Sequence, residues 1–103
     1  MKFKLYQIKK QLVSTGTYLF MSYNFAKNHG FDIRDYDVVY EGEIESGRYI
    51  EDTLENIFYM FNMQRPEDFK GHSMSVSDIV EINGEFFYTD SVGFKSLGYG
   101  LLQ

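Results

Sequence analysis

The chain lacks cysteine and tryptophan altogether and has only one proline among its 103 residues. Without cysteine it can form no disulfide, no thiolate nucleophile and no sulfur-ligated metal site. It has no apolar run near the roughly 20 residues that a membrane-spanning helix needs, and no signal peptide. Low-complexity stretches are missing too, so we expect a single cytoplasmic domain over residues 1–103, without long disordered segments.

Aromatic residues are what the chain has in excess, since ten Phe and nine Tyr make up 18% of it. Each buried ring removes a large apolar area from water, so even a chain of this length can build a core. Aromatic residues left over on the surface would mark a binding site, because large exposed apolar patches usually contact a partner.

The charged residues are unevenly distributed along the chain, which has a formal net charge of −5. Residues 1–31 contain five lysines and no acid, whereas residues 32–55 contain nine acids and two arginines. An acidic surface repels nucleic-acid phosphate, so we expect no direct binding of DNA or RNA. The acidic middle is either a solvated face that aids solubility or a docking surface for a basic protein. The candidate contact residues of that docking surface are Glu41, Glu43, Glu45, Glu51, Asp52 and Glu55.

Asn83-Gly84 is the strongest local structural signal, because a two-residue type I′ turn needs positive φ at both central positions. β-branched and aromatic residues flank it over residues 79–82 and 85–89. A turn of two residues fixes the register of the hairpin. The expected pairs are Ile82–Glu85, Glu81–Phe86, Val80–Phe87, Ile79–Tyr88, Asp78–Thr89 and Ser77–Asp90.

The same register places Asp78 on one face with Val76, Val80 and Ile82, and if that face is the core, Asp78 is a carboxylate in apolar surroundings. A buried carboxylate must be hydrogen-bonded, because its uncompensated burial costs roughly several kcal/mol. Nearby serine hydroxyls and backbone amides are suitable donors, and Asp90 should accept amide hydrogens of the turn that follows it. We interpret the polar motif of this region as structural. Its residues are His72, Ser75, Ser77, Asp78, Asp90, Ser91, Gly93 and Phe94.

These segments also carry a family resemblance. The sequence PEDF at 66–69 leads into GHSMSVSDIV at 71–80, and YTDSVGF follows at 88–94. Upstream, LYQ at 5–7 and VVYEGE at 38–43 fit an opening and a middle strand. On these motifs the chain resembles the YodL-like domain family of Bacillota, often found in proteins of plasmids, phages and conjugative elements. Val92 departs from the pattern, where an aromatic residue is expected. The resemblance informs fold and setting more than mechanism, since the family has no well-defined common activity.

Hydrophobic periodicity and capping signals predict the secondary structure. We expect strands at Phe3–Ile8, Thr17–Met21, Asp37–Ile44, Ile79–Ile82 and Glu85–Thr89, and a loop at Ser14–Gly16. We expect helices at Tyr23–His29, with Ser22 as N-cap and Gly30 at the end, and at Ile50–Met63, with residue 52 as an alternative start. Residues 91–103 contain three glycines and should be mostly irregular.

The expected order β-β-α-β-α-β-β predicts an α+β fold. In this fold two helices pack on one face of a small antiparallel or mixed sheet of about five strands. The helical spacing of Leu54, Ile57, Phe58 and Phe61 predicts that these side chains are buried against the sheet. The opposite face of the sheet must then be exposed to solvent or contact a partner.

The inventory of catalytic residue types is poor. His29 and His72 are the only histidines, and His29 stands at a predicted helix end, where an imidazole suits the helix dipole. His72-Ser73, with Asp78 or Asp90, supplies the residue types of a Ser/His/Asp triad, but geometry defines a triad. No spacing matches a metal-ligand pattern, and no glycine-rich phosphate loop is present. We therefore expect no enzymatic activity, no cofactor and no metal.

The sequence favours a non-catalytic protein-interaction module, an accessory factor of a bacterial mobile element with an unknown protein partner. One alternative is an acidic inhibitor of a host nucleic-acid enzyme, whose basic channel an acidic surface can occupy. Another is a small hydrolase that uses His72. A pocket in which His72 reaches a serine hydroxyl and a carboxylate together would favour the hydrolase, and competition with DNA for a host nuclease would favour the inhibitor.

Overall fold

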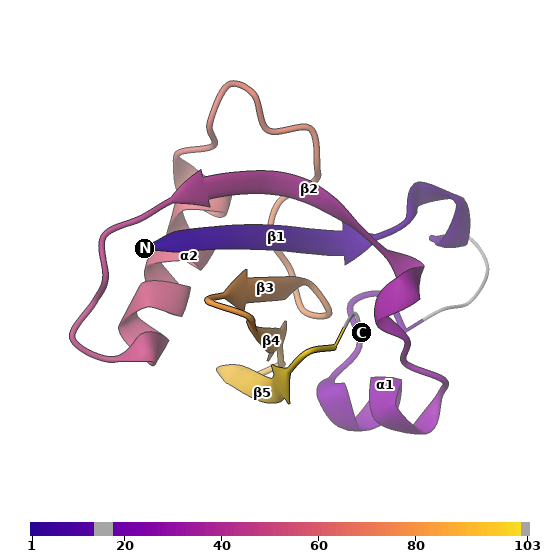
Figure 1. Cartoon of the computed structure of the whole chain (residues 1–103). Helices are drawn as coiled ribbons and strands as arrows, with labels where there is room; N and C mark the ends of the chain where they lie inside the picture. The colour runs from indigo at the N-terminus through magenta and orange to yellow at the C-terminus, as the bar shows by residue number, and fades with distance from the viewer. Residues whose placement is uncertain (14–17, 102–103) are drawn as a thin grey trace.

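The computed structural model describes residues 1–13 and 18–101, which form one sheet and two α-helices (Figure 1). In chain order, the elements are β1 (Lys2–Ile8), α1 (Tyr23–Asn28), β2 (Tyr36–Glu43), α2 (Ile50–Met63), β3 (Ile79–Ile82), β4 (Glu85–Thr89) and β5 (Phe94–Tyr99). Short 3-10 helices at Lys10–Leu12 and Ile33–Asp35 follow β1 and precede β2. The α+β fold class expected from the sequence is confirmed, and the order is β-α-β-α-β-β-β.

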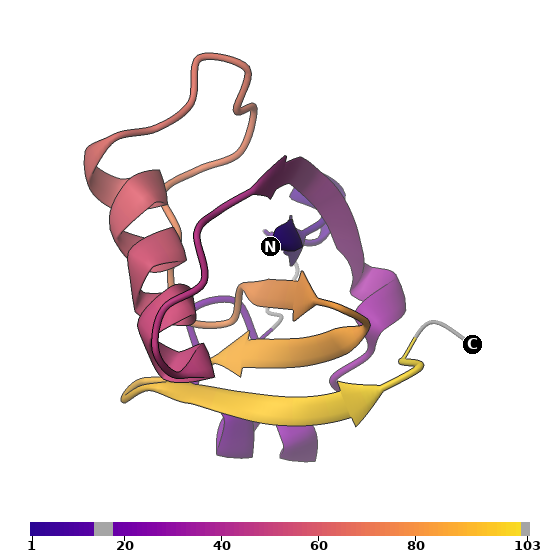
Figure 2. The same ribbon diagram turned by 60° about the vertical axis from the view of Figure 1, so that its left-hand side comes forward.

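The strands lie in the order β2-β1-β3-β4-β5, and all neighbouring pairs are antiparallel. Figure 2 shows β5, in yellow, at one edge of the sheet and β2, in magenta, at the other. The register expected for the β3–β4 hairpin is confirmed from Ile79 opposite Tyr88 to Ile82 opposite Glu85. Asn83 and Gly84 have φ of 51° and 86°, the positive values that a type I′ turn requires.

The two helices cover opposite faces of the sheet, so the expectation that both pack on one face is wrong. On one face α2 packs against Phe3 and Leu5 of β1, and on the other α1 packs with Tyr6 and Ile8 of the same strand. Figure 1 shows the two helices at opposite ends of β1. The reason lies in the central strands, which carry apolar side chains on both faces and so need cover on both.

Helix α2 has the bounds expected from its periodicity, and it begins at Ile50 rather than at the alternative residue 52. Asp52 instead reaches back from the first turn, where its Oδ2 accepts the Tyr49 N–H at 3.1 Å. Three of the four side chains expected to be buried are so, whereas Phe58 is only half-buried. The expected N-cap of α1 is confirmed, because Ser22 Oγ accepts the Phe25 N–H at 3.3 Å.

The strand expected at residues 17–21 is wrong over its described part. Residues 18–21 form a turn closed by a 2.9 Å hydrogen bond from Met21 N–H to Tyr18 O. Phe20 has φ of 66°, which a strand cannot accommodate. Of the apolar side chains that suggested a strand, Tyr18 and Leu19 pack into the core, whereas Phe20 and Met21 are exposed. Residue 17 and the loop expected at residues 14–16 lie outside the described residues.

The expectation that residues 91–103 are mostly irregular is also wrong, because β5 pairs with β4 over Phe94–Tyr99. Gly98, with φ of 86°, sits beside a shift of register between Phe86 and Phe87. Glycine with positive φ is the residue that a β-bulge takes. The glycines that suggested an irregular tail thus include one that lets the edge strand continue past a bulge.

Candidate functional site

A buried glutamine of β1 holds the loop that carries the sequence motif. Gln7 is only 2% exposed, and its Oε1 accepts the His72 N–H at 3.1 Å. Its Nε2 donates to His72 O and to Asp78 Oδ2, both at 2.9 Å. The antiparallel pairing of β1 with β3, continued by one residue, brings Gln7 beside Asp78. Sequence reasoning missed this residue, although a polar side chain in the apolar run of β1 was the available signal.

The same glutamine explains the glycine of the motif. A Cβ at Gly71 would collide with Gln7 Oε1 and lie 2.8 Å from the ring of Phe69. Only glycine therefore lets the loop backbone approach the glutamine amide closely enough for the two hydrogen bonds to His72. Gly71 is thus required by packing, in agreement with a structural interpretation of the motif.

Asp78 is completely buried beside the glutamine. Its Oδ2 also accepts the Ser75 N–H at 2.9 Å, whereas its Oδ1 has no hydrogen-bond partner in the described part of the chain. Burial raises the pKa of Asp78 to about 7, although the hydrogen bonds from the Ser75 N–H and from Gln7 lower it. The charge of this carboxyl therefore changes near neutral pH.

Ser77 adopts a backbone conformation that normally requires glycine. It is the third residue of the turn Ser75–Asp78, closed by a 3.1 Å hydrogen bond from Asp78 N–H to Ser75 O, and its φ is 87°. The turn leads into a bulge, because Ser77 N–H donates to Thr89 O while Thr89 N–H donates to Asp78 O. Positive φ at a residue other than glycine costs about 1–3 kcal/mol, so other contacts must hold Ser77 in place.

Two long-range hydrogen bonds stabilise this conformation. Tyr36 Oη donates to Ser77 O at 2.6 Å, and Ser77 Oγ accepts the Phe20 N–H at 3.1 Å. Phe20 itself has positive φ. A hydrogen bond therefore joins two residues with strained backbone, Phe20 and Ser77, although 57 positions separate them in the chain. Strain of this kind is commonly stored at functional sites.

Residues 18–25, called the aromatic segment below, are held at further points by the motif. Tyr23 N–H donates to Asp90 Oδ1 at 3.1 Å, and Tyr88 Oη donates to Met21 O at 2.8 Å. The His72 ring meets the Phe20 ring edge-on, with 6.1 Å between centroids. Asp90 also accepts the Ser91 N–H at 2.8 Å, which confirms the expected hydrogen bond to the turn that follows it, whereas its hydrogen bond to the aromatic segment has no signal in the local sequence.

The segment so held presents apolar side chains to solvent. Phe20 is 58% exposed, and Met21 and Phe25 are exposed as well. Val92, at 90% exposure, lies in the adjoining turn closed by Asp90 N–H and Gly93 O at 3.0 Å. Asp90 ties that turn to Tyr23, which lies two residues from both Met21 and Phe25. We call Phe20, Met21, Phe25 and Val92 the apolar contact surface.

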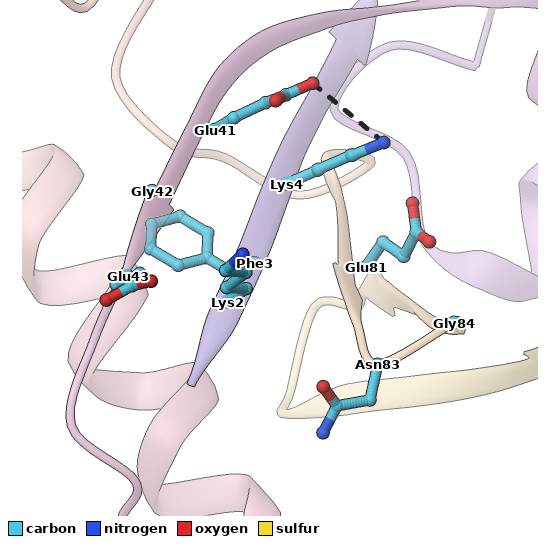
Figure 3. A pocket seen from close by; sticks show the side chains of 9 residues that line it. All are labelled: Lys2, Phe3, Lys4, Glu41, Gly42, Glu43, Glu81, Asn83 and Gly84. Atoms are coloured by element: carbon cyan, nitrogen blue, oxygen red, sulfur yellow. Dashed lines mark ion pairs between the residues drawn. The ribbon is translucent and has the colours of Figure 1, made fainter.

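Two candidate acids of β2, Glu41 and Glu43, lie on the sheet face away from α2. Lys2 and Lys4 flank Phe3, which points toward α2, so both lysines point to the other face. Glu43 and Glu41 pair with them across the strands, and Glu41 lies 3.9 Å from Lys4 Nζ (Figure 3). These side chains line a cavity of about 420 Å³ in which both signs of charge are present.

The other four candidate acids belong to α2 and the loop before it. Glu51 and Asp52 lie in the first turn of α2, where the helix dipole favours negative charge, and Asp52 also caps the helix. Glu45 and Glu55 are exposed. The structure thus divides the six acids between two groups and gives several of them local roles.

The described neighbours of the His72 ring do not form a catalytic triad with it. Its Nδ1 is 2.7 Å from Ser73 O and 3.4 Å from Gln7 Nε2. Among residues 1–13 and 18–101, the ring makes no hydrogen bond to a serine hydroxyl or a carboxylate, and no three His, Asp or Glu side chains are grouped to hold a metal ion. The second histidine, His29, stacks on Phe25 with 3.8 Å between centroids.

The chain matches the family model described as YodL-like domain over residues 2–99. The match includes both motif segments, at 71–80 and 88–94. Neither the curated proteins nor the solved structures contain a match to the chain. In the part of the chain that the structure describes, no helix is both long and apolar enough to cross a membrane.

Proposed function

We propose, from the premise that this chain belongs to the YodL-like domain family, that it is a non-catalytic protein-interaction module. It contacts its partner through the apolar contact surface. The partner is a protein of the bacterial cytoplasm, and the setting is the mobile element that the family resemblance implies. One observation carries the proposal: the motif holds Phe20 in a strained conformation that leaves the residue 58% exposed.

The energetics favour a binding role for that ring. A side chain needed only for the core would be buried, whereas here the hydrogen bond from Phe20 N–H to Ser77 Oγ and the edge-on contact with the His72 ring hold Phe20 in an exposed position. A phenylalanine side chain can bury about 150–250 Å². Covering the exposed part of Phe20 would therefore contribute about 3 kcal/mol at roughly 25 cal/mol per Å². Such a side chain is suited to be the anchor of an interface.

The arrangement of the other candidate residues gives less support to the two alternatives. An inhibitor that imitates nucleic acid needs acids along one surface, and here two candidate acids lie beside Lys2 and Lys4 on the face opposite α2. A hydrolase needs a general base near its nucleophile, and the contacts of His72 are to a backbone oxygen, a glutamine and a phenylalanine ring.

The test compares partner capture by the wild-type chain with capture by Phe20→Asn. Asparagine tolerates positive φ, so this variant removes the ring and keeps the backbone conformation. The matched control is Tyr59→Asn, which removes an exposed aromatic ring of α2 far along the chain from the contact surface. Proteins captured from a bacterial lysate by the wild-type chain are identified, purified and titrated against all three.

We expect Phe20→Asn to weaken binding about 100-fold, which corresponds to about 3 kcal/mol. We expect Tyr59→Asn to bind as the wild type does. Melting temperatures establish that both variants are folded. Equal affinity of the wild type and Phe20→Asn, or equal losses in the two variants, would refute the proposed contact surface.

A further inference from the structure

A small cavity lies on the α2 side of the turn at residues 90–93. Its volume is about 220 Å³, and its apolar walls include Phe58, Val76 and Phe94. Its polar lining includes Glu55, Thr89 and Asp90. Pockets for drug-sized ligands usually measure about 300–1,000 Å³, so this cavity suits a single side chain rather than a whole small molecule. Phe58 is half-buried because it forms a wall of this cavity instead of packing wholly into the core.

Thr89 contributes a polar group that lacks a partner. The residue is 3% exposed, and its Oγ1 has no hydrogen bond in the described part of the chain. Phe87, two residues earlier on β4, packs with the α2 side of the core, so the alternation of the strand points Thr89 to the same side as the cavity. A buried hydroxyl without a partner costs about 1–3 kcal/mol, a cost that an entering donor would remove.

The charge of the side chains that line the cavity determines which kind of hydrogen-bond donor can bind there. Glu55 and Asp90 are carboxylates, and none of the described residues that line the cavity is basic. Both hydrogen bonds of Asp90 go to Oδ1, so in the described residues Oδ2 is left without one. The faces of aromatic rings attract cations, and Phe58 and Phe94 supply two such rings. An N–H donor that carries a positive charge fits all of these groups.

We infer that this cavity receives an arginine side chain of the protein partner. Its guanidinium lies between Glu55 and Asp90 and donates to Thr89 Oγ1, while its stem lies against Phe58 and Phe94. Arginine fits better than lysine because its planar guanidinium has five donors, pairs with carboxylates through two of them and stacks on rings. The inference rests on the proposed function, since a protein partner must supply the side chain.

The test uses Nα-acetyl-arginine methylamide as the probe, titrated into the ¹⁵N-labelled full chain. We expect amide shifts confined to residues 55–58 and 89–94. The uncharged norleucine analogue, which keeps an alkyl stem, should leave these amides unchanged. Glu55→Gln should weaken binding about fivefold, as expected for an exposed ion pair. Glu51→Gln, one turn earlier on α2 and outside the cavity, is the matched control and should bind as the wild type does.

Thr89→Val separates binding from structure, because valine keeps the shape and removes only the hydroxyl. We expect weaker arginine binding together with a melting temperature that is unchanged or higher, since no hydrogen bond is lost on folding. A lower melting temperature with unchanged binding would overturn the inference, as would equal shifts with the norleucine probe, tighter binding of the lysine analogue, or no shifts with arginine.

The probe assay contains no partner protein, so its result does not depend on whether the proposed function is correct. Phe20→Asn should bind the arginine probe as the wild type does. A chain that binds the probe but captures no partner through Phe20 would refute the proposed function alone. Capture that depends on Phe20, without binding of the probe, would refute the arginine site alone.

Discussion

The buried carboxyl of Asp78 makes the stability of this domain depend on pH in a direction opposite to that of most carboxylates. Burial raises the pKa of Asp78 to about 7 in the folded chain, against about 3.9 for an unfolded aspartate. Between these values the folded state holds a proton that the unfolded state has released. The stability that this group contributes is therefore fully present below about pH 4 and is lost as the pH rises through about 7.

The size of the effect follows from the two pKa values. A difference of about three units, at 1.36 kcal/mol for each, gives about 4 kcal/mol between pH 4 and pH 8. This is a large share of the roughly 5–15 kcal/mol that stabilises a small domain. Asp78→Asn keeps an oxygen that can accept from Ser75 N–H and Gln7 Nε2 but carries no ionisable group. Its stability should therefore lack this dependence on pH.

The measurement is urea unfolding at several pH values, followed by far-ultraviolet circular dichroism because the chain has no tryptophan. The free energy of unfolding of the wild type minus that of Asp78→Asn should fall by about 4 kcal/mol from pH 4 to pH 8. Taking this difference cancels the other carboxylates, which are common to both chains. Asp68→Asn, an exposed position, should give a flat difference. A flat difference for Asp78→Asn as well would refute the reasoning.

Three further predictions concern packing and strain, all measured as free energies of unfolding in urea. Gly71→Ala should cost about 1–3 kcal/mol, because its Cβ collides with the Gln7 amide, and no loss would mean that the loop is not held there. Ser77→Ala should be less stable than Ser77→Gly by about 1 kcal/mol, because both lose the hydroxyl but only alanine is strained at positive φ. Phe61→Ala should cost about 3–5 kcal/mol and Phe58→Ala clearly less, since only Phe61 is fully buried, and equal costs would contradict this packing.

Local signals were enough to predict several elements of the fold. The turn at Asn83-Gly84 fixes its own register, because the φ values that it needs are properties of those two residues. The bounds of helix α2 follow from the helical spacing of its apolar residues, whichever surface they pack against. The start of α1 follows from the N-cap at Ser22. These elements are encoded by residues within a few positions of one another.

The errors occurred where a distant partner decides the conformation. Residues 18–21 are as apolar as a strand, but they pair with no strand of the sheet in the described structure, and Ser77 holds Phe20 in a turn. Strand β5 forms because β4 offers an edge, and Gly98 absorbs the bulge instead of ending the strand. Which face each helix covers depends on the complete sheet, so the spacing within a helix cannot determine it.

The α+β class and the hairpin follow from the sequence alone, because alternation and turn chemistry are local properties, whereas the burial of Asp78 depends on which face of the sheet becomes core. The sequence did not determine the candidate site. Gln7 reaches Asp78 across 71 residues, and Phe20 reaches Ser77 across 57. Such contacts exist only once β1 lies beside β3 and the aromatic segment folds back over the motif, so the exposed surface that the motif supports is a property of the tertiary structure.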